Sequence, residues 1–157
     1  MANPTALFGF SPYRFLSGKT FPITSGTTAS NVTVVAGQAL VLGTDGYLKL
    51  PGNTSVGIFG IATEGVTGAT GVRKTVCFIP AMENLVFRAR CGTTVNVTVG
   101  YTGYVRSLKV SGAYMGVHPS YAGGSCLKIL GLAPGSAWGT AAEVLVAIRS
   151  STWTGQK

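Results

Sequence analysis

The segment from residue 71 to 91 constrains the fold most strongly, because its apolar side chains recur with the period of a β-strand. In residues 85–91 every odd-numbered side chain is apolar, whereas the even-numbered ones include Arg88 and Arg90. Successive side chains of a strand point to opposite faces of a sheet, so one face is expected to enter the core. Residues 72–79 become apolar on both faces toward their end, which predicts a strand covered on both sides. A short turn after Pro80 is expected to join the two strands as a hairpin, since proline ends the backbone pairing.

The composition favours many short strands joined by glycine-rich turns. Glycine occurs 23 times among 157 residues, and charged residues make up only 10%. A chain of this length is expected to form one domain with about ten strands and no helix. The predicted fold class is all-β, an antiparallel barrel or sandwich of jelly-roll type. Because so few charges would solvate a free monomer, part of the surface is expected to be covered by other subunits.

Further strands follow from local patterns. Residues 38–50 are predicted to form a hairpin, with Asp45 and Gly46 supplying a turn that tolerates positive φ. Residues 93–99 alternate strictly, which predicts a half-exposed strand with its valines, including Val99, facing inward. The other predicted strands are 31–35, 56–62, 103–110, 126–130 and 144–148, and the Gly/Tyr/Ser-rich residues 111–124 are predicted to form a long loop.

The first 25 residues differ from the rest of the chain. They contain a dense group of aromatic residues, interrupted by prolines and without periodicity: Phe8, Phe10, Tyr13, Phe15 and Phe21. This composition predicts an extended N-terminal arm over residues 1–25, followed by a single β-domain over residues 26–157. Exposed aromatic side chains must pack somewhere, so the arm is expected to contact a neighbouring protein. Packing on its own domain is the alternative.

The net charge of +8 indicates an anionic partner. The basic residues are scattered rather than clustered, and nucleic-acid binders usually carry them in runs or stripes. An acidic protein surface is therefore at least as plausible as a nucleic acid. Arg88 and Arg90 lie two residues apart on one predicted strand face, where they could bind carboxylates or phosphates. A solvated outer face is the alternative interpretation of this pair.

The sequence offers few residues for catalysis or metal binding. It contains one histidine, His118, one aspartate, Asp45, and three glutamates that lie far apart. General acid-base chemistry needs paired titratable groups, and zinc or calcium sites need clustered ligands. We therefore expect no enzyme activity, no catalytic residue, no metal, no cofactor and no small-molecule substrate.

The three cysteines, Cys77, Cys91 and Cys126, lie in apolar contexts without metal-binding spacing. Buried free thiols are the favoured interpretation, and a bridge between Cys77 and Cys91 is the alternative. No apolar run is long enough to cross a membrane, and no signal peptide is evident, so folding in the cytoplasm is expected.

Several segments are similar to a known group of structural proteins. The opening residues 1–12, MANPTALFGFSP, resemble the start of capsid cement or decoration proteins of tailed bacteriophages. Residues 36–42, then Asp45-Gly46-Tyr47 and residues 58–62, look like a pattern found in the same proteins. Residues 127–132, Ala137-Trp138-Gly139 and residues 144–148 are also similar to this group.

The resemblance implies a virion structural protein, made in the cytoplasm of the host bacterium. It would bind the outside of the phage head, clamp neighbouring subunits of the major capsid protein and form a homotrimer. The residues expected to bind these partners are Phe8, Phe10, Tyr13, Arg14, Phe15, Arg88 and Arg90. Another β-type virion component, such as a tail or head-fibre base, is the first alternative. A basic barrel that binds nucleic acid through exposed aromatic residues is less favoured.

Overall fold

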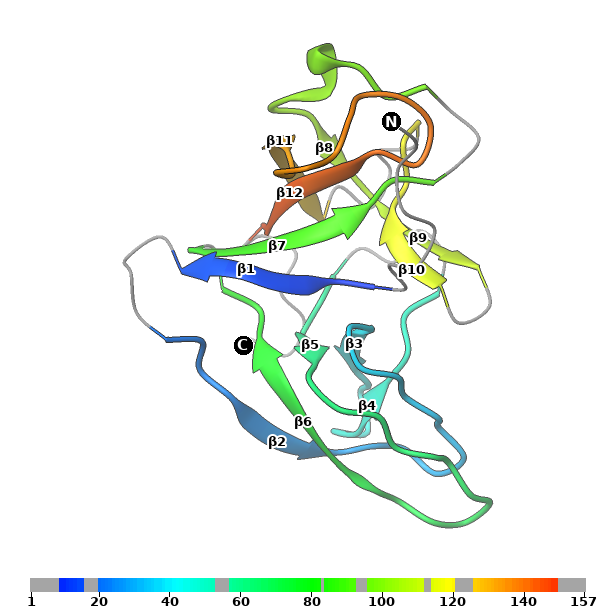
Figure 1. The fold of residues 1–157 in the computed structure, drawn as a ribbon. Helices are drawn as coiled ribbons and strands as arrows, with labels where there is room; N and C mark the ends of the chain where they lie inside the picture. The colour runs from blue at the N-terminus through cyan, green and yellow to red at the C-terminus, as the bar shows by residue number, and fades with distance from the viewer. Residues whose placement is uncertain are drawn as a thin grey trace.

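The computed structural model describes residues 9–15, 20–52, 57–82, 84–92, 96–111, 114–120 and 126–149, without the side chains of Phe15 and Tyr114. These residues form twelve strands and one short 3-10 helix, η1 (Val99–Tyr101), and they include no α-helix (Figure 1). All strand pairs within the sheets are antiparallel. The predicted all-β class is confirmed. No helix in the described part of the chain is long and apolar enough to cross a membrane.

Two five-stranded sheets and one hairpin make up the fold. The first sheet, called here the arm sheet, has the order β1 (Ser11–Phe15), β7 (Leu85–Arg90), β12 (Glu143–Ile148), β11 (Leu127–Leu132) and β8 (Val105–Arg106). The second, called here the barrel sheet, has the order β2 (Thr24–Thr27), β6 (Thr75–Pro80), β5 (Gly60–Ala62), β3 (Ala39–Leu42) and β4 (Leu48–Lys49). The hairpin consists of β9 (Leu108–Ser111) and β10 (Tyr114–Val117).

The barrel sheet curls until its two ends meet. Thr28, just after β2, forms a parallel bridge with Leu48 in β4. The Ala29 amide also donates to the Leu48 carbonyl over 2.9 Å. The curled sheet encloses its own apolar cluster of Val34, Leu40, Leu48, Ala62, Val76 and Phe78.

The main core lies between the two sheets. Leu85, Phe87 and Ala89 of β7 enter it, which confirms the predicted core face of this strand. From the opposite side, β6 contributes Ile79 to the main core and Val76 to the enclosed cluster of the barrel sheet. Because β6 is buried on both faces, the prediction of a strand covered on both sides is also confirmed.

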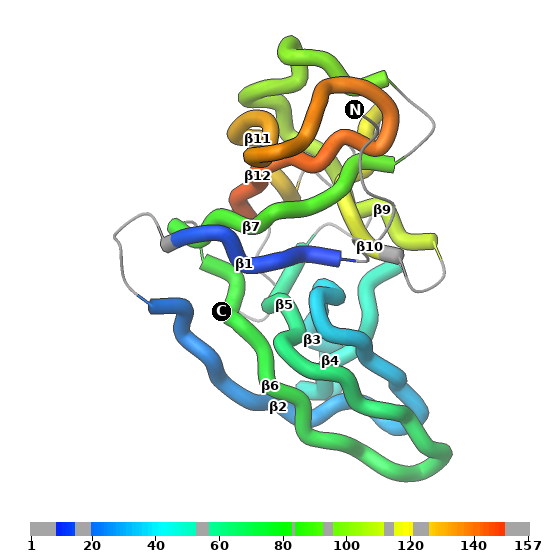
Figure 2. The backbone as a smooth tube through the Cα atoms, viewed as in Figure 1, coloured from blue at the N-terminus to red at the C-terminus, as the bar shows by residue number. Residues whose placement is uncertain are grey.

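The predicted hairpin between these two strands is wrong. β6 pairs with β2 and β5, whereas β7 pairs with β1 and β12, so the strands belong to different sheets. The Leu85 amide donates to the Met82 carbonyl over 3.2 Å in the connection, and the trace in Figure 2 passes from the lower sheet to the upper one. Alternation shows which face of a strand is buried, but it does not show which strand lies beside it.

The hairpin predicted for residues 38–50 is confirmed. β3 and β4 pair with Leu42 opposite Leu48, and Gly46 has a φ of 80° in the turn. The Asp45 carboxylate accepts a hydrogen bond from the Tyr47 amide at 3.2 Å, which fixes the turn. The strands predicted at 126–130 and 144–148 also form, and they pair with each other as β11 and β12.

Three other local predictions are wrong. No strand forms at 31–35, because Asn31 adopts a φ of 63° and Val34 makes only an isolated bridge. In the strand predicted at 93–99, Val97 is buried as predicted, but Val99 lies exposed in η1 rather than inward. Residues 93–95 of that strand lie outside the described residues. The predicted long loop 111–124 contains β10, which pairs with β9 because the residues after 114 supply a second apolar strand.

All three cysteines are unpaired, as the favoured interpretation predicted, but only Cys91 and Cys126 are also buried as it predicted. Burial raises the pKa of Cys91 to about 12 and that of Cys126 to about 11. Cys77 is half-buried at the outside of β6. These thiols therefore act as core or surface side chains and not as a bridge.

Candidate interaction site

The outer face of the arm sheet gathers basic residues from three strands, β1, β7 and β11. Directly opposed residues of paired strands lie on the same face, and one row across the sheet reads Lys128, Ala147, Val86 and Arg14. The strand alternation then places Arg88 and Arg90 of β7 on this face as well. We call the surface that carries Arg14, Arg88, Arg90 and Lys128 the basic face. Three of these four residues were predicted as partner-binding residues, and the fold brings them together.

Arg88 is held by an ion pair within the basic face. Its guanidinium contacts the Glu143 carboxylate through both Nε and Nη2. The Glu143 side chain is 2% exposed and that of Arg88 is 32% exposed. The Ser136 hydroxyl oxygen also accepts a hydrogen bond from the Glu143 amide at 3.0 Å. Arg88 is thus partly neutralised, and its main contact is with its own chain.

The free edge of β1 carries the most exposed of the predicted residues. A β-bulge interrupts the pairing of β1 with β7 between Pro12 and Arg14. Tyr13, within this bulge, is 40% exposed, and the Arg14 guanidinium lies 6.0 Å from the centre of its ring. A bulge redirects side chains away from the regular alternation. It therefore presents an aromatic ring beside a cation at the rim of the basic face.

Phe10 does not belong to this surface. Its side chain is 2% exposed in the main core, and its ring meets that of Phe87 edge-on at 6.5 Å. The ring of Phe21 also lies 6.4 Å from that of Phe87. Burial in its own domain leaves Phe10 no side-chain surface for another protein, so we remove it from the predicted partner-binding set. Phe8 and the side chain of Phe15 lie outside the described part of the chain. The predicted partner-binding roles of these two residues therefore stay predictions.

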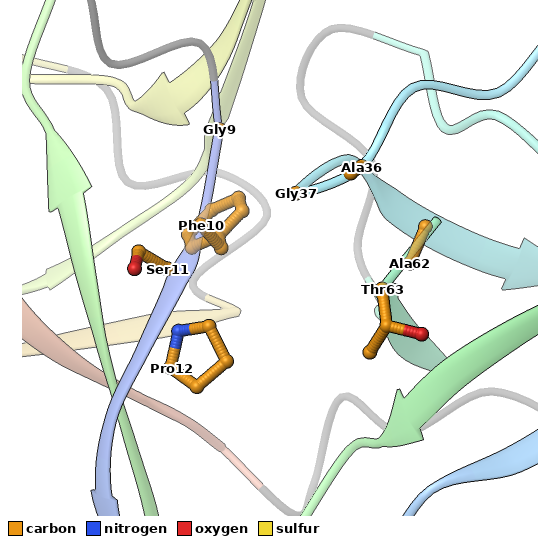
Figure 3. Close-up of a pocket in the computed structure, with 8 residues that line it drawn as sticks. All are labelled: Gly9, Phe10, Ser11, Pro12, Ala36, Gly37, Ala62 and Thr63. Atoms are coloured by element: carbon orange, nitrogen blue, oxygen red, sulfur yellow. The ribbon is translucent and has the colours of Figure 1, made fainter. Parts of the chain in front are cut away.

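A shallow pocket of about 330 Å³ lies beside the start of β1, between the two sheets. Figure 3 shows Phe10, Ser11 and Pro12 on one side of it and Ala36, Gly37, Ala62 and Thr63 on the other. The Phe10 amide donates to the Gly37 carbonyl over 2.7 Å, which ties the arm to the barrel sheet here. None of the eight lining residues carries an ionisable side chain. The pocket lies where the start of β1 meets the barrel sheet, and its lining side chains cannot act as acids or bases.

A second basic and aromatic cluster surrounds β8, and sequence reasoning missed it. The Arg106 guanidinium lies over two rings, 5.2 Å from the centre of Tyr101 and 4.8 Å from that of Tyr104. Its Nε donates to the Pro119 carbonyl at 3.0 Å, which fixes the stack. Two tyrosines within five residues of an arginine, beside a strand edge, are the sequence pattern that could have indicated this stack. We call this group the Arg106 cluster.

Other cations lie near the Arg106 cluster. Burial lowers the pKa of His118, and the charges of Lys109 and Arg106 lower it further. The His118 amide donates to the Ser107 carbonyl over 2.9 Å, so β8 and the residues after β10 are joined here. The positive charges of Lys109 and Arg106 thus lie close enough to His118 to lower its pKa.

The described acidic residues are all engaged within the chain. Asp45 pairs with Lys49 at 2.8 Å, and this contact is the main cause of the lowered pKa of Asp45. Glu64 accepts a hydrogen bond from the Cys77 amide at 2.8 Å, which lowers the pKa of Glu64. Glu143 is buried against the basic face. Within the described residues no group of three or more His, Cys, Asp or Glu could hold a metal ion.

No protein-family model matches the chain, and no curated protein matches it in sequence.

Proposed function

We propose that this chain is a virion structural protein that binds the outside of a phage head and clamps neighbouring major capsid subunits. The resemblance of residues 1–12 and of the later segments supplies the class of partner. The geometry supplies the surface that would bind it. The basic face and the exposed Tyr13–Arg14 edge would meet acidic and polar groups of the shell.

The observation that carries this proposal is the gathering of Arg14, Arg88, Arg90 and Lys128 on one sheet face. A basic surface favours acidic partners and accelerates encounter with them. Aromatic residues and arginine at the centre of an interface commonly supply most of the binding energy. Tyr13 and Arg14 are therefore the leading anchor residues, and Arg88 has the lesser role because Glu143 already binds it.

The proposed clamp would act as a homotrimer at local three-fold positions of the shell. Repetition of a modest contact over many symmetric positions multiplies its effect through avidity. Sedimentation of the purified chain, alone and at rising concentration, tests this oligomeric state. A chain that remains monomeric at all concentrations and on the head would contradict the trimer.

Binding of the purified chain to undecorated heads of the phage that encodes it tests the proposed function. We expect saturable binding of the unmodified chain. Arg14→Glu should weaken it at least tenfold, because like charges then face the acidic shell. Lys74→Glu is the matched control, since it makes the same charge change at an exposed residue just before β6, away from the arm sheet. Absence of binding by the unmodified chain would refute the capsid role, and equal losses for both variants would refute the assigned surface.

A nucleic-acid role is the second candidate, and the Arg106 cluster favours it. Arginine stacked on aromatic rings is a common feature of single-strand binding surfaces. Binding of a single-stranded oligonucleotide, with affinity falling steeply as salt rises, would support that role. No oligonucleotide binding at low salt would eliminate it. The head-binding and oligonucleotide experiments together separate the two candidates.

A further inference from the structure

The face of the β9–β10 hairpin that is turned away from the core carries two basic side chains, Lys109 and His118. Leu108 and Val117 are opposed in the ladder, and both enter the main core. The His118 amide donates to the Ser107 carbonyl over 2.9 Å, so the pairing continues one residue beyond β10. Alternation therefore places Lys109 and His118 together on the outer face, as diagonal neighbours on opposed strands.

The Lys109 side chain is directed toward Pro119. The position that a Cβ atom of Gly92 would occupy is 3.2 Å from Cδ of Pro119 and 3.9 Å from Cγ of Lys109, so both side chains meet at this glycine. Gly92 is itself joined to β10, because its amide donates to the Val117 carbonyl over 3.0 Å. Gly116, which stands opposite Lys109, carries no side chain that would block the lysine.

Arg106 approaches Pro119 from β8. Its Nε donates to the Pro119 carbonyl at 3.0 Å, and its Nη1 donates to the Val105 carbonyl at 2.9 Å. These bonds and the rings of Tyr101 and Tyr104 hold the guanidinium in one orientation. Two of the five N–H donors of an arginine are used in this way. The other donors of Arg106 have no partner within the described residues.

No described carboxylate balances these charges. The described carboxylates are engaged at other places in the chain, and they belong to Asp45, Glu64 and Glu143. Within the same residues Arg106 and Lys109 form no ion pair. Both charges lie close enough to His118 to lower its pKa. A group of basic side chains without a counter-charge creates a positive potential that favours a bound anion.

We propose that Arg106, Lys109 and His118 form a binding site for a phosphate group, called here the phosphate site. The three side chains come from different segments, so each can bind a different oxygen of a tetrahedral phosphate. A carboxylate offers only two oxygens in one plane. The basic face is a weaker candidate for this ligand, because Glu143 already binds Arg88 there. The inference does not depend on binding to a phage head.

The surroundings of the phosphate site fit two sources of the phosphate group. Tyr104, whose ring lies 4.8 Å from the Arg106 guanidinium, is 50% exposed. A nucleotide whose phosphate occupied the site could stack its base on this ring. The phosphate group could therefore be a free ion or part of a nucleic-acid strand, and the experiment below separates these sources.

An NMR titration of His118 with pH tests the inference on the full chain. His118 is the single histidine of the sequence, so its ring signals report on the phosphate site alone. The other titratable groups around the site give no histidine signal, and they are Tyr101, Tyr104, Cys91 and Cys126. A bound anion favours the protonated imidazole and therefore raises the pKa of His118.

The pKa of His118 should rise by about 1 in saturating inorganic phosphate, compared with chloride at the same ionic strength. Such a rise corresponds to tenfold tighter binding to the protonated histidine. Sulfate has the same shape and does not itself titrate near neutral pH, so it should give a similar rise. An unchanged pKa in both phosphate and sulfate, or an equal rise in acetate, would overturn the assignment.

Two variants with one control make the test specific. Lys109→Gln removes one charge from the site and should weaken phosphate binding about tenfold. Lys74→Gln makes the same change at an exposed residue just before β6 and should leave the affinity unchanged. Arg106→Lys keeps the charge but loses the planar fork, so it should also weaken binding. Equal phosphate affinities for Lys109→Gln and Lys74→Gln would overturn the inference even if Arg106→Lys fails to fold.

A single-stranded oligonucleotide without a terminal phosphate identifies the source of the phosphate group. A shift of the His118 signals at a lower concentration of oligonucleotide than of inorganic phosphate would support a site for a nucleic-acid strand. A shift with inorganic phosphate alone would support a site for the free ion and would count against the nucleic-acid role. Lys109→Gln should bind phage heads as the unmodified chain does, so failure of the phosphate site and failure of the capsid role are distinguishable.

Discussion

Replacement of Phe10 by alanine tests whether the N-terminal arm belongs to the core of its own domain. Phe10 is 2% exposed, and its ring packs edge-on against Phe87 at 6.5 Å. Loss of a buried phenylalanine ring costs about 3–5 kcal/mol, because the cavity only partly collapses. About 0.5–1.5 kcal/mol of that loss is expected to come from the aromatic pair. The free energy of unfolding should therefore fall by about 4 kcal/mol.

Urea unfolding followed by circular dichroism measures this loss. At roughly 2–4 °C for each kcal/mol in a chain of this size, the thermal midpoint should fall by about 8–16 °C. Tyr13→Ala is the matched control, because Tyr13 lies three residues further along the same arm and is 40% exposed. The control should change the free energy of unfolding by no more than about 0.5 kcal/mol. A double-mutant cycle with Phe87→Ala isolates the coupling between the two rings.

A loss below about 1 kcal/mol for Phe10→Ala would refute the assignment of the arm to the core. The same result would return Phe10 to the surface that contacts a neighbour. Equal losses for Phe10→Ala and Tyr13→Ala would have the same meaning, since only burial distinguishes the two positions.

The remaining predictions concern the ion pair, the thiols and one glycine. Arg88→Ala should lower the free energy of unfolding by about 3 kcal/mol or more, because it leaves a buried carboxylate unpaired. Glu143→Gln should lower it less, and urea unfolding of both variants checks this order. A thiol reagent at neutral pH should label Cys77 in the folded chain and Cys91 only after unfolding, which mass spectrometry resolves. Because burial raises the pKa of Cys91 to about 12, ionisation favours the unfolded state, so stability should fall as pH rises above about 9, and an alkaline unfolding series measures it. Gly60→Ala would place a methyl group 2.7 Å from a backbone oxygen of the neighbouring strand. It should lower the free energy of unfolding by about 1–3 kcal/mol, which urea unfolding measures.

The sequence predicts the buried faces of strands well, because burial depends on local alternation. Phe87 in β7 and Val76 in β6 both lie on the faces that their neighbours indicated. The hairpin at Asp45 was equally predictable, since its turn chemistry is local. Strand partners were not, because the choice of partner for β6 and β7 depends on contacts between residues far apart in the chain.

The candidate site was predictable only in part for the same reason. Arg88 and Arg90 share a strand, so their common face followed from spacing alone. Lys128 joins them through the pairing of β11 with β12, and no local pattern indicates that pairing. The burial of Glu143 beneath Arg88 was also hidden, because the two residues lie 55 positions apart. Aromatic density in the arm indicated that Phe10 must be covered, but it could not indicate by which surface.

The central proposal is that the chain binds the outside of a phage head through its basic face. If a phage genome encodes the chain, a cryo-electron microscopy map of that virion, at a resolution sufficient to fit the two sheets, tests the proposal most directly. We expect density for the chain at local three-fold positions on the outer shell, with β1 and the basic face turned toward the capsid subunits. A bare outer shell, or density for this chain in the tail instead, would contradict the account.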